Sequence, residues 1–228
     1  MKKQKDLNYQ FSWDERRPCL YERVLFVPEY YFEHQSFEMP PLREVFGNDN
    51  PVAIEYCSGN GEWILERAKE SPHLNWIAVE MRFTRVRKIW SKMHNMGIEN
   101  MIVVCGDAND FIRYYLPSDS VDRVYVNFPD PWPKEKHAKN RLIQEPFVKE
   151  MDRTLREGSE VTIVTDHPEY SEQVIEEMNK TFEPMFESPY YVEKDDEYGT
   201  SYFNRLWVEK GCFIRFMKFQ KTPSAVLC

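Results

Sequence analysis

Residues 52–107 read VAIEYCSGNGEWILERAKESPHLNWIAVEMRFTRVRKIWSKMHNMGIENMIVVCGD, and this stretch decides the fold. Short apolar runs alternate in it with amphipathic segments, at residues 52–57, 62–71, 75–81, 82–96 and 101–107. Short strands separated by segments of helical periodicity predict β-α-β units, whose right-handed crossovers build a parallel sheet. The stretch therefore predicts a doubly wound α/β fold with helices on both faces of a sheet.

The alternation continues beyond this stretch. Further strands are expected at 121–128, 160–166 and 212–219, and further helices at 108–116, 144–156 and 168–182. Residues 1–50 are aromatic, charged and interrupted by prolines, so we expect an N-terminal extension laid over the core. The expected organisation is an extension at 1–50, one α/β domain at 51–221 and a C-terminal tail at 222–228.

Composition and charge limit the classes of function. The 228 residues contain 30 bases and 38 acids, a net charge of -8. The acidity is local, because residues 145–197 hold 16 acids and 5 bases, so a nucleic-acid partner is not excluded. The five cysteines show no CxxC spacing and the histidines no metal-site spacing, so we expect no metal and no disulfide. No apolar run is long enough for a membrane helix and no signal peptide is evident, so a cytoplasmic location is expected.

Acidic side chains end four of the expected strands. Ligands of doubly wound sheets bind beyond the carboxyl ends of the strands, and these acids are Glu55, Glu80, Asp107 and Asp130. Gly59 and Gly61 allow a tight turn after the first strand, and Glu80 lies where an acid would bind a ribose hydroxyl. Negative charge repels a pyrophosphate but attracts the sulfonium and ammonium of S-adenosylmethionine. Each acid taken alone is better explained as a solvated loop carboxylate than as a ligand contact. An NAD-type oxidoreductase is disfavoured because GxGxxG is absent and the charge has the wrong sign.

A second signal is NFPDPWPKEKHAKNR, residues 127–141. Two prolines flank Asp130 and stiffen its loop, and Trp132 offers a plane for stacking. A basic patch follows, formed by Lys134, Lys136, Lys139 and Arg141. An aromatic ring, a carboxylate and a basic surface together indicate a pocket for a nucleic-acid base. His137 lies in this patch, and we interpret it as a phosphate neighbour rather than a general base.

From Pro51 to Lys221 the chain resembles the bacterial tRNA (guanine-N7)-methyltransferase family, through the string NFPDPWPK-x-x-H-x-K-x-R. The resemblance implies a Rossmann-like, S-adenosylmethionine-dependent fold, mostly parallel with an antiparallel last strand. It also implies methyl transfer to N7 of a guanine in the variable loop of tRNA, by a monomer or homodimer. Asp130 is the implied catalytic residue, and the implied cofactor contacts are Glu55, Gly59, Gly61, Glu80, Asp107 and Asp130. The implied substrate contacts are Lys134, Asp166, Thr200, Ser201, Tyr202 and Phe203.

Three positions depart from the family pattern. Cys57 replaces the usual first glycine, Asn140 replaces a base, and Phe203 replaces a glutamate. These departures leave open a second hypothesis, in which the chain is a weakened relative that binds tRNA as a scaffold.

The chemistry of guanine sets the demands on the site. N7 has an in-plane lone pair and no proton to remove, so orientation matters more than a base. A carboxylate that accepts hydrogens from N1 and N2 would grip the opposite edge of the ring, and either Asp130 or Asp166 could supply it. The helix at 82–94 has an apolar face and a basic face without matching acids, from which we expect phosphate contacts. The basic face comprises Arg82, Arg85, Arg87, Lys88 and Lys92.

Overall fold

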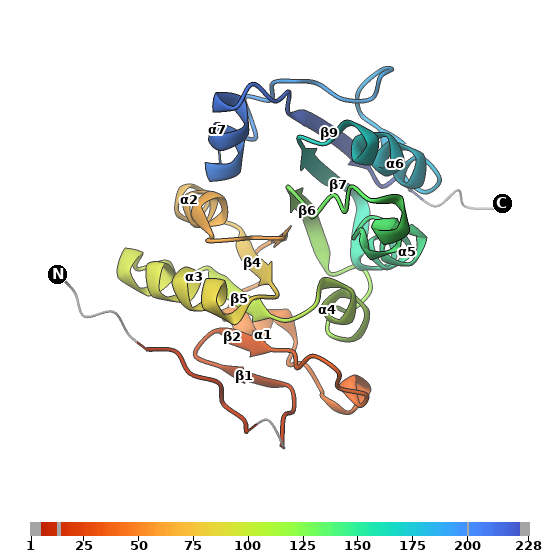
Figure 1. The fold of residues 1–228 in the computed structure, drawn as a ribbon. Coiled ribbons are helices and arrows are strands. Elements are labelled where there is room, and N and C mark those ends of the chain that lie inside the picture. Colours follow the sequence, from red (N-terminus) through yellow and green to blue (C-terminus); the bar gives the residue numbers. More distant parts are fainter. Residues whose placement is uncertain (1–5, 13–14, 200, 224–228) are drawn as a thin grey trace. The chain divides into compact units, whose positions relative to one another are not determined.

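The computed structural model describes residues 6–12, 15–199 and 201–223, and the chain divides after Leu116 into two units. Unit 1 precedes this division and unit 2 follows it. Each unit contains strands with helices packed against them (Figure 1). We describe each unit by itself.

In the described part of unit 1, five strands form a sheet in the order β1-β2-β5-β4-β3. Its centre consists of three parallel strands that are buried along their whole length: β3 (Val52–Tyr56), β4 (Asn75–Glu80) and β5 (Met101–Cys105). The helices of the β-α-β units are α2 (Glu62–Glu70), α3 (Phe83–Met96) and α4 (Ala108–Tyr114). Helices α2 and α3 pack against each other and against β4. The alternation of residues 52–107 therefore predicted these elements within one or two residues.

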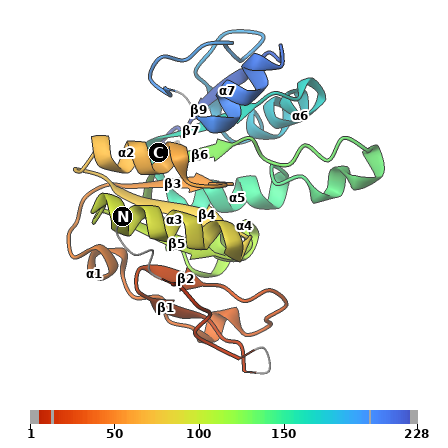
Figure 2. The ribbon, with the colours of Figure 1, turned by 60° about the vertical axis from the view of Figure 1, so that its left-hand side comes forward.

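The N-terminal residues also enter this sheet. Strands β1 (Cys19–Tyr21) and β2 (Val24–Phe26) form an antiparallel hairpin, and β2 pairs in parallel with β5, with Val24 opposite Val103 (Figure 2). The short helices η1 (His34–Ser36) and α1 (Leu42–Phe46) follow. Residues 1–50 are thus more than a cover laid over a core, because β2 is buried within the sheet. The domain boundary at residue 51 stays a prediction.

Unit 2 contains the remaining strands. Strand β6 (Val121–Asn127) pairs in parallel with β7 (Leu155–Thr165), while β9 (Arg215–Gln220) is antiparallel to both β7 and β8 (Glu183–Pro184). Helices α5 (Glu145–Thr154) and α6 (Pro168–Met178) lie side by side. Two further helices are η2 (Glu135–Asn140) and α7 (Tyr202–Glu209). The expected α/β class, mostly parallel with an antiparallel last strand, is confirmed.

Two helix boundaries were wrong. The helix expected over 168–182 ends at Met178 in α6. Apolar spacing predicted a helix over 144–156 with Leu155 on its buried face, but α5 ends at Thr154. Leu155 is buried because it begins β7, where it lies opposite Val121. A buried apolar residue at the start of a strand therefore occupied the position at which the next turn of an amphipathic helix would place one.

None of the helices in the described segments is long and apolar enough to cross a membrane.

Candidate functional site

All of the expected cofactor residues except Asp130, which belongs to unit 2, lie at one edge of the unit 1 sheet. Because β3, β4 and β5 are parallel, their carboxyl ends share this edge, and Glu80 lies opposite Cys105 in the register. Glu55 is buried near the end of β3, Glu80 ends β4, and Asp107 follows β5 by two residues. Three of the four expected acids, each from a different strand, therefore lie at the same edge.

The turn after β3 has left-handed backbone at three positions. Cys57, Gly59 and Gly61 have φ angles of +64°, +57° and +73°. A Cβ atom on Gly61 would lie 2.8 Å from Cγ1 of Ile89 in α3, so glycine is required there for close helix packing. Cys57 holds the conformation that glycine adopts freely, at a cost in strain. The replacement of glycine by Cys57 has kept a left-handed turn.

Glu80 links the loops that follow two strands. Its side chain is 6% exposed, and its carboxylate accepts hydrogen bonds from the backbone N–H of Gly59 at 3.0 Å and of Arg82 at 2.8 Å. The guanidinium of Arg85 lies 3.5 Å from the same carboxylate. The sequence analysis did not predict that Arg85 contacts this edge. Its place in the first turn of α3, the helix that follows Glu80, could have indicated the contact. Glu80 is thereby fixed in orientation before any ligand binds.

Asp107 caps the helix that follows β5. Its Oδ1 accepts hydrogen bonds from the backbone N–H groups of Asn109 at 2.8 Å and Asp110 at 3.3 Å. Burial raises the pKa of the Asp110 carboxyl, the Asp107 charge raises it further, and His34 at 3.6 Å lowers it. Negative charge is therefore concentrated at the start of α4.

The residues at this edge fit the expected cofactor. Glu55, Glu80 and Asp107 carry one sign of charge, which favours a sulfonium and an ammonium and opposes a pyrophosphate. Glu80 is already oriented by two backbone donors, as a carboxylate that receives ribose hydroxyls needs to be. This set of carboxylates thus matches S-adenosylmethionine better than a dinucleotide.

In unit 2, Asp130 lies on the loop between β6 and η2, which projects as the green segment before α5 in Figure 2. Phe128 and Trp132, two residues to either side of Asp130, have φ angles of +48° and +41°. Left-handed backbone at non-glycine residues persists only where the surroundings hold it, and such residues cluster at functional sites. The N–H of Phe128 donates to the carbonyl of Val164 at 2.8 Å, which anchors the loop to β7. Asp130 itself is exposed.

Asp166 lies near the Asp130 loop because their strands are neighbours. Strands β6 and β7 are parallel, and Asn127 lies opposite Val164, so both acids follow the same edge of the unit 2 sheet. Asp166 is partly exposed and precedes α6, whose first turn is capped by the His167 side chain accepting from the Tyr170 N–H at 3.4 Å. Asp130 and Asp166 therefore both remain candidates for accepting hydrogen bonds from one edge of the guanine.

The basic patch divides into two kinds of residue. Lys134, Lys136 and Lys139 are exposed, and within the described residues none of them makes an ion pair. Arg141 is partly buried and donates to the carbonyl of Pro131 at 2.8 Å. The three lysines can meet phosphates, whereas Arg141 faces the protein.

The basic face of α3 differs from expectation. Arg85 pairs with Glu80, and the remaining acid partners come from outside the helix: Asp6 lies 3.5 Å from Arg87, and Glu62 lies 3.7 Å from Lys92. The expectation that these bases lack matching acids was therefore wrong for three of the five. The apolar face is confirmed, since Val86, Trp90 and Met93 are buried.

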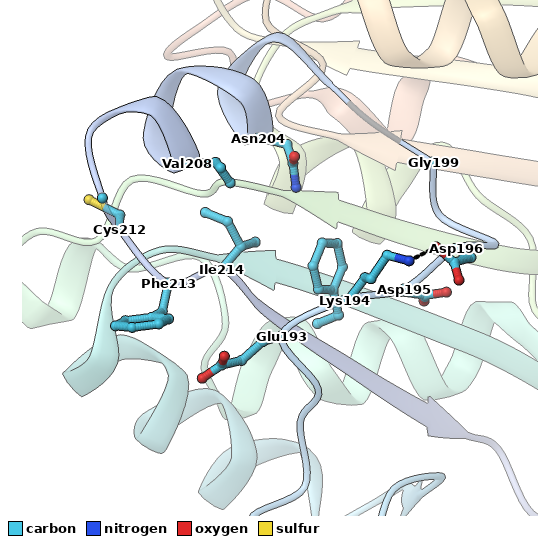
Figure 3. Close-up of a pocket in the computed structure, with 12 residues that line it drawn as sticks. Glu193, Lys194, Asp195, Asp196, Gly199, Asn204, Val208, Cys212, Phe213 and Ile214 are labelled. Atoms are coloured by element: carbon cyan, nitrogen blue, oxygen red, sulfur yellow. Dashed lines mark ion pairs between the residues drawn. The ribbon is translucent and has the colours of Figure 1, made fainter.

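The expected substrate segment begins α7. Thr200 lies outside the described residues, and so does the side chain of Phe203. Ser201 is buried, and its hydroxyl caps α7 by accepting from the Asn204 N–H at 3.0 Å, while Tyr202 is 46% exposed. A surface cavity of about 680 Å³ lies between α7, the 193–199 loop and the start of β9 (Figure 3).

That cavity has the wrong charge for RNA. Glu193, Asp195 and Asp196 line it against Lys194, which pairs with Asp196 at 2.8 Å. Phosphates require the opposite sign. The expected substrate contacts that the structure describes are not among the residues that line it: Lys134, Asp166, Ser201 and Tyr202. Within the described residues, no group of three histidine, cysteine or acidic side chains could hold a metal.

Comparison with known proteins agrees with this arrangement. A family model described as a putative methyltransferase, Methyltransf_4, matches residues 49–214. A tRNA (guanine-N(7)-)-methyltransferase of Chlamydia felis is 49% identical over 96% of this chain and 97% of its own length. One from Marinobacter nauticus is 35% identical over 79% of this chain and 76% of its own length. A crystal structure of the aminoglycoside resistance methyltransferase NpmB1 matches with a TM-score of 0.56 at 18% identity, over 82% of this chain and 95% of that chain.

Proposed function

The chain belongs to the family of tRNA (guanine-N(7)-)-methyltransferases, and we propose that it methylates tRNA with S-adenosylmethionine as the methyl donor. The proposed acceptor is N7 of a guanine in the variable loop. The observation that carries the proposal is this membership, since a relative at 49% identity spans 96% of the chain. The acid-lined edge of unit 1 and the Asp130 loop of unit 2 support it independently.

The residues of unit 1 would hold the cofactor. Glu80 would receive the ribose hydroxyls, because its two oxygens are already held by Gly59 and Arg82. Glu55 and Asp107 would favour the cationic groups of the ligand through their charge. When bound, S-adenosylmethionine supplies a methyl group on a positively charged sulfur.

The residues of unit 2 would orient the guanine. N7 carries no proton, so the protein needs no base to generate the nucleophile and contributes placement instead. Asp130 or Asp166 would accept hydrogen bonds from the N1 and N2 hydrogens, which fixes the edge opposite N7 and leaves N7 unobstructed. Trp132, 36% exposed beside Asp130, would stack on a base.

The three exposed lysines of η2 and its cap would hold the RNA backbone. Lys134, Lys136 and Lys139 follow directly after the Asp130 loop and are available to phosphates. A cytoplasmic location and a monomer or homodimer remain predictions. The scaffold hypothesis gains no support, because Cys57 keeps a left-handed turn and Glu80 keeps its hydrogen bonds.

The test is incubation of the purified protein with methyl-labelled S-adenosylmethionine and bulk tRNA, followed by digestion and separation of the nucleosides. We expect the label in 7-methylguanosine, at one position of each modified tRNA. A variant with Asp130 replaced by asparagine is the matched control, since it removes one charge from an exposed position. Label in another nucleoside, or binding of tRNA without transfer of label, would contradict the proposal.

A further inference from the structure

Arg141 uses its guanidinium inside the protein. Its Nε donates to the carbonyl of Pro131 at 2.8 Å, and its two terminal nitrogens donate to the side-chain oxygen of Gln173 and, at 3.5 Å, to the carbonyl of Trp132. Its Cζ lies 5.2 Å from the centre of the Tyr170 ring, a cation–π contact. All three nitrogens and one face of the Arg141 guanidinium therefore make contacts within the chain.

These contacts join the Asp130 loop to α6. Pro131 and Trp132 follow Asp130 directly, while Tyr170 and Gln173 belong to α6, which begins just after Asp166. The joint is reinforced at Ile143, whose N–H donates to the Tyr170 hydroxyl at 3.1 Å and whose carbonyl accepts from Gln173 at 3.2 Å. One side chain thus connects the backbone beside the first candidate acid to the helix that follows the second.

The backbone of the loop needs such support. Phe128 and Trp132 both have left-handed conformations that non-glycine residues rarely adopt. Strained conformations of this kind persist only where surrounding contacts determine them. On the Trp132 side, those contacts include the two carbonyls that accept from Arg141.

We propose that Arg141 is a positioning residue that fixes the Asp130 loop relative to α6, and that it is not part of the RNA-binding basic patch. The inference rests on the proposed function for its effect on turnover, and it changes the sequence-based assignment of Arg141 to phosphate contact. Lysine cannot replace it, because one ammonium cannot reach two loop carbonyls and the Gln173 oxygen while also covering the Tyr170 ring.

The deciding variant is Arg141→Lys, since it keeps the charge and loses the geometry. A phosphate contact would tolerate it, whereas a positioning role predicts a fall in kcat of about 10–100-fold, as expected for a misplaced reacting group. We expect the KM for tRNA and its dependence on salt to stay near the wild-type values. The contrasting variant is Lys139→Gln on η2, for which we expect a raised KM for tRNA and a salt slope lower by about 0.7–0.9.

Two further measurements keep the inference testable if Arg141→Lys folds poorly. Gln173→Ala removes one partner of Arg141 without changing charge, and it should lower kcat with an unchanged salt slope. Hydrogen exchange of a peptide over residues 128–134 should be faster in both variants, and this readout does not require activity. Three prolines and the peptide's own N-terminal residue leave Asp130, Trp132 and Lys134 as amide reporters in that segment.

The outcomes separate the two proposals. Wild-type protein that transfers no methyl group to tRNA would count against the proposed function, while altered exchange in residues 128–134 would still support the role of Arg141. Normal kcat and exchange in both variants would overturn the inference and leave the function intact. A reduced salt slope in Arg141→Gln, which removes the charge, together with normal exchange over residues 128–134 would return Arg141 to the RNA-binding patch.

Discussion

Replacing Glu80 by glutamine tests how the cofactor edge is organised. Glutamine keeps the length of the side chain, but its amide nitrogen must face either the Gly59 N–H or the Arg82 N–H, which are both donors. One charge-assisted hydrogen bond is lost and the other becomes neutral. At about 1.5–3 kcal/mol for a charged hydrogen bond and 0.5–1.5 kcal/mol for a neutral one, the expected loss of stability is about 2–4 kcal/mol.

The Arg85 pair adds little to this figure. Its side chain is 36% exposed and its nitrogen lies 3.5 Å from Glu80, a geometry that contributes about 0–1 kcal/mol. The total of about 2–5 kcal/mol corresponds, for a chain of this size, to a fall in Tm of about 4–20 °C. Loss of the ribose contact should also raise the Kd for S-adenosylhomocysteine about 10–150-fold.

The assays are thermal unfolding and calorimetric titration with S-adenosylhomocysteine. Glu70→Gln is the matched control, because Glu70 pairs with Arg67 on the surface of α2 and its side chain is 60% exposed. Its loss should change stability by less than about 1 kcal/mol and leave affinity unchanged. A Glu80→Gln protein with wild-type Tm would refute the structural reasoning. A lowered Tm with wild-type affinity would refute the ribose contact alone.

The other predictions concern the remaining loops of the site. Asp130→Asn should reduce methyl transfer at least about 100-fold with an unchanged Tm, because Asp130 is exposed; turnover near the wild-type rate in a kinetic assay would remove Asp130 from the chemistry. Joint replacement of Lys134, Lys136 and Lys139 by glutamine should reduce the slope of log affinity for tRNA against log salt by about 2–3, and an unchanged slope in filter binding would place the RNA elsewhere. Cys57→Gly should relieve about 1–3 kcal/mol of strain, offset by about 0.4–1 kcal/mol of chain entropy, and leave cofactor affinity within about twofold; a large gain in affinity would mean that the cysteine side chain obstructs the turn.

The sequence predicted elements wherever local pattern and burial coincide. The strands and helices of residues 52–107 follow the alternation because each strand is buried on both faces, which leaves an uninterrupted apolar run. Strand β2 has only three residues and lies between prolines, and it exists because β5 offers it a partner. Such pairing depends on tertiary structure, so the local periodicity of the sequence does not predict it.

The candidate site shows the same division. Acids at strand ends can be read from the sequence, because the end of an apolar run fixes which edge of the sheet they reach. The ion-pair partners of basic side chains cannot be predicted from the sequence, since Asp6 and Glu62 pair with Arg87 and Lys92 from distant parts of the chain. The sequence therefore overestimated the positive charge that α3 offers to RNA.

The arrangement of charge explains how an acidic protein can act on tRNA. A net charge of -8 opposes nucleic acid only weakly at the contact, because salt screens acids that lie more than about 8–10 Å from it. What matters locally is whether a base has an acid partner, and Lys134, Lys136 and Lys139 have none within the described residues, whereas three bases of α3 do. Phosphate binding should then concentrate at the loop that carries Asp130. Affinity and orientation of the guanine would come from one short segment, in which lysines bind the backbone and Arg141 holds the loop.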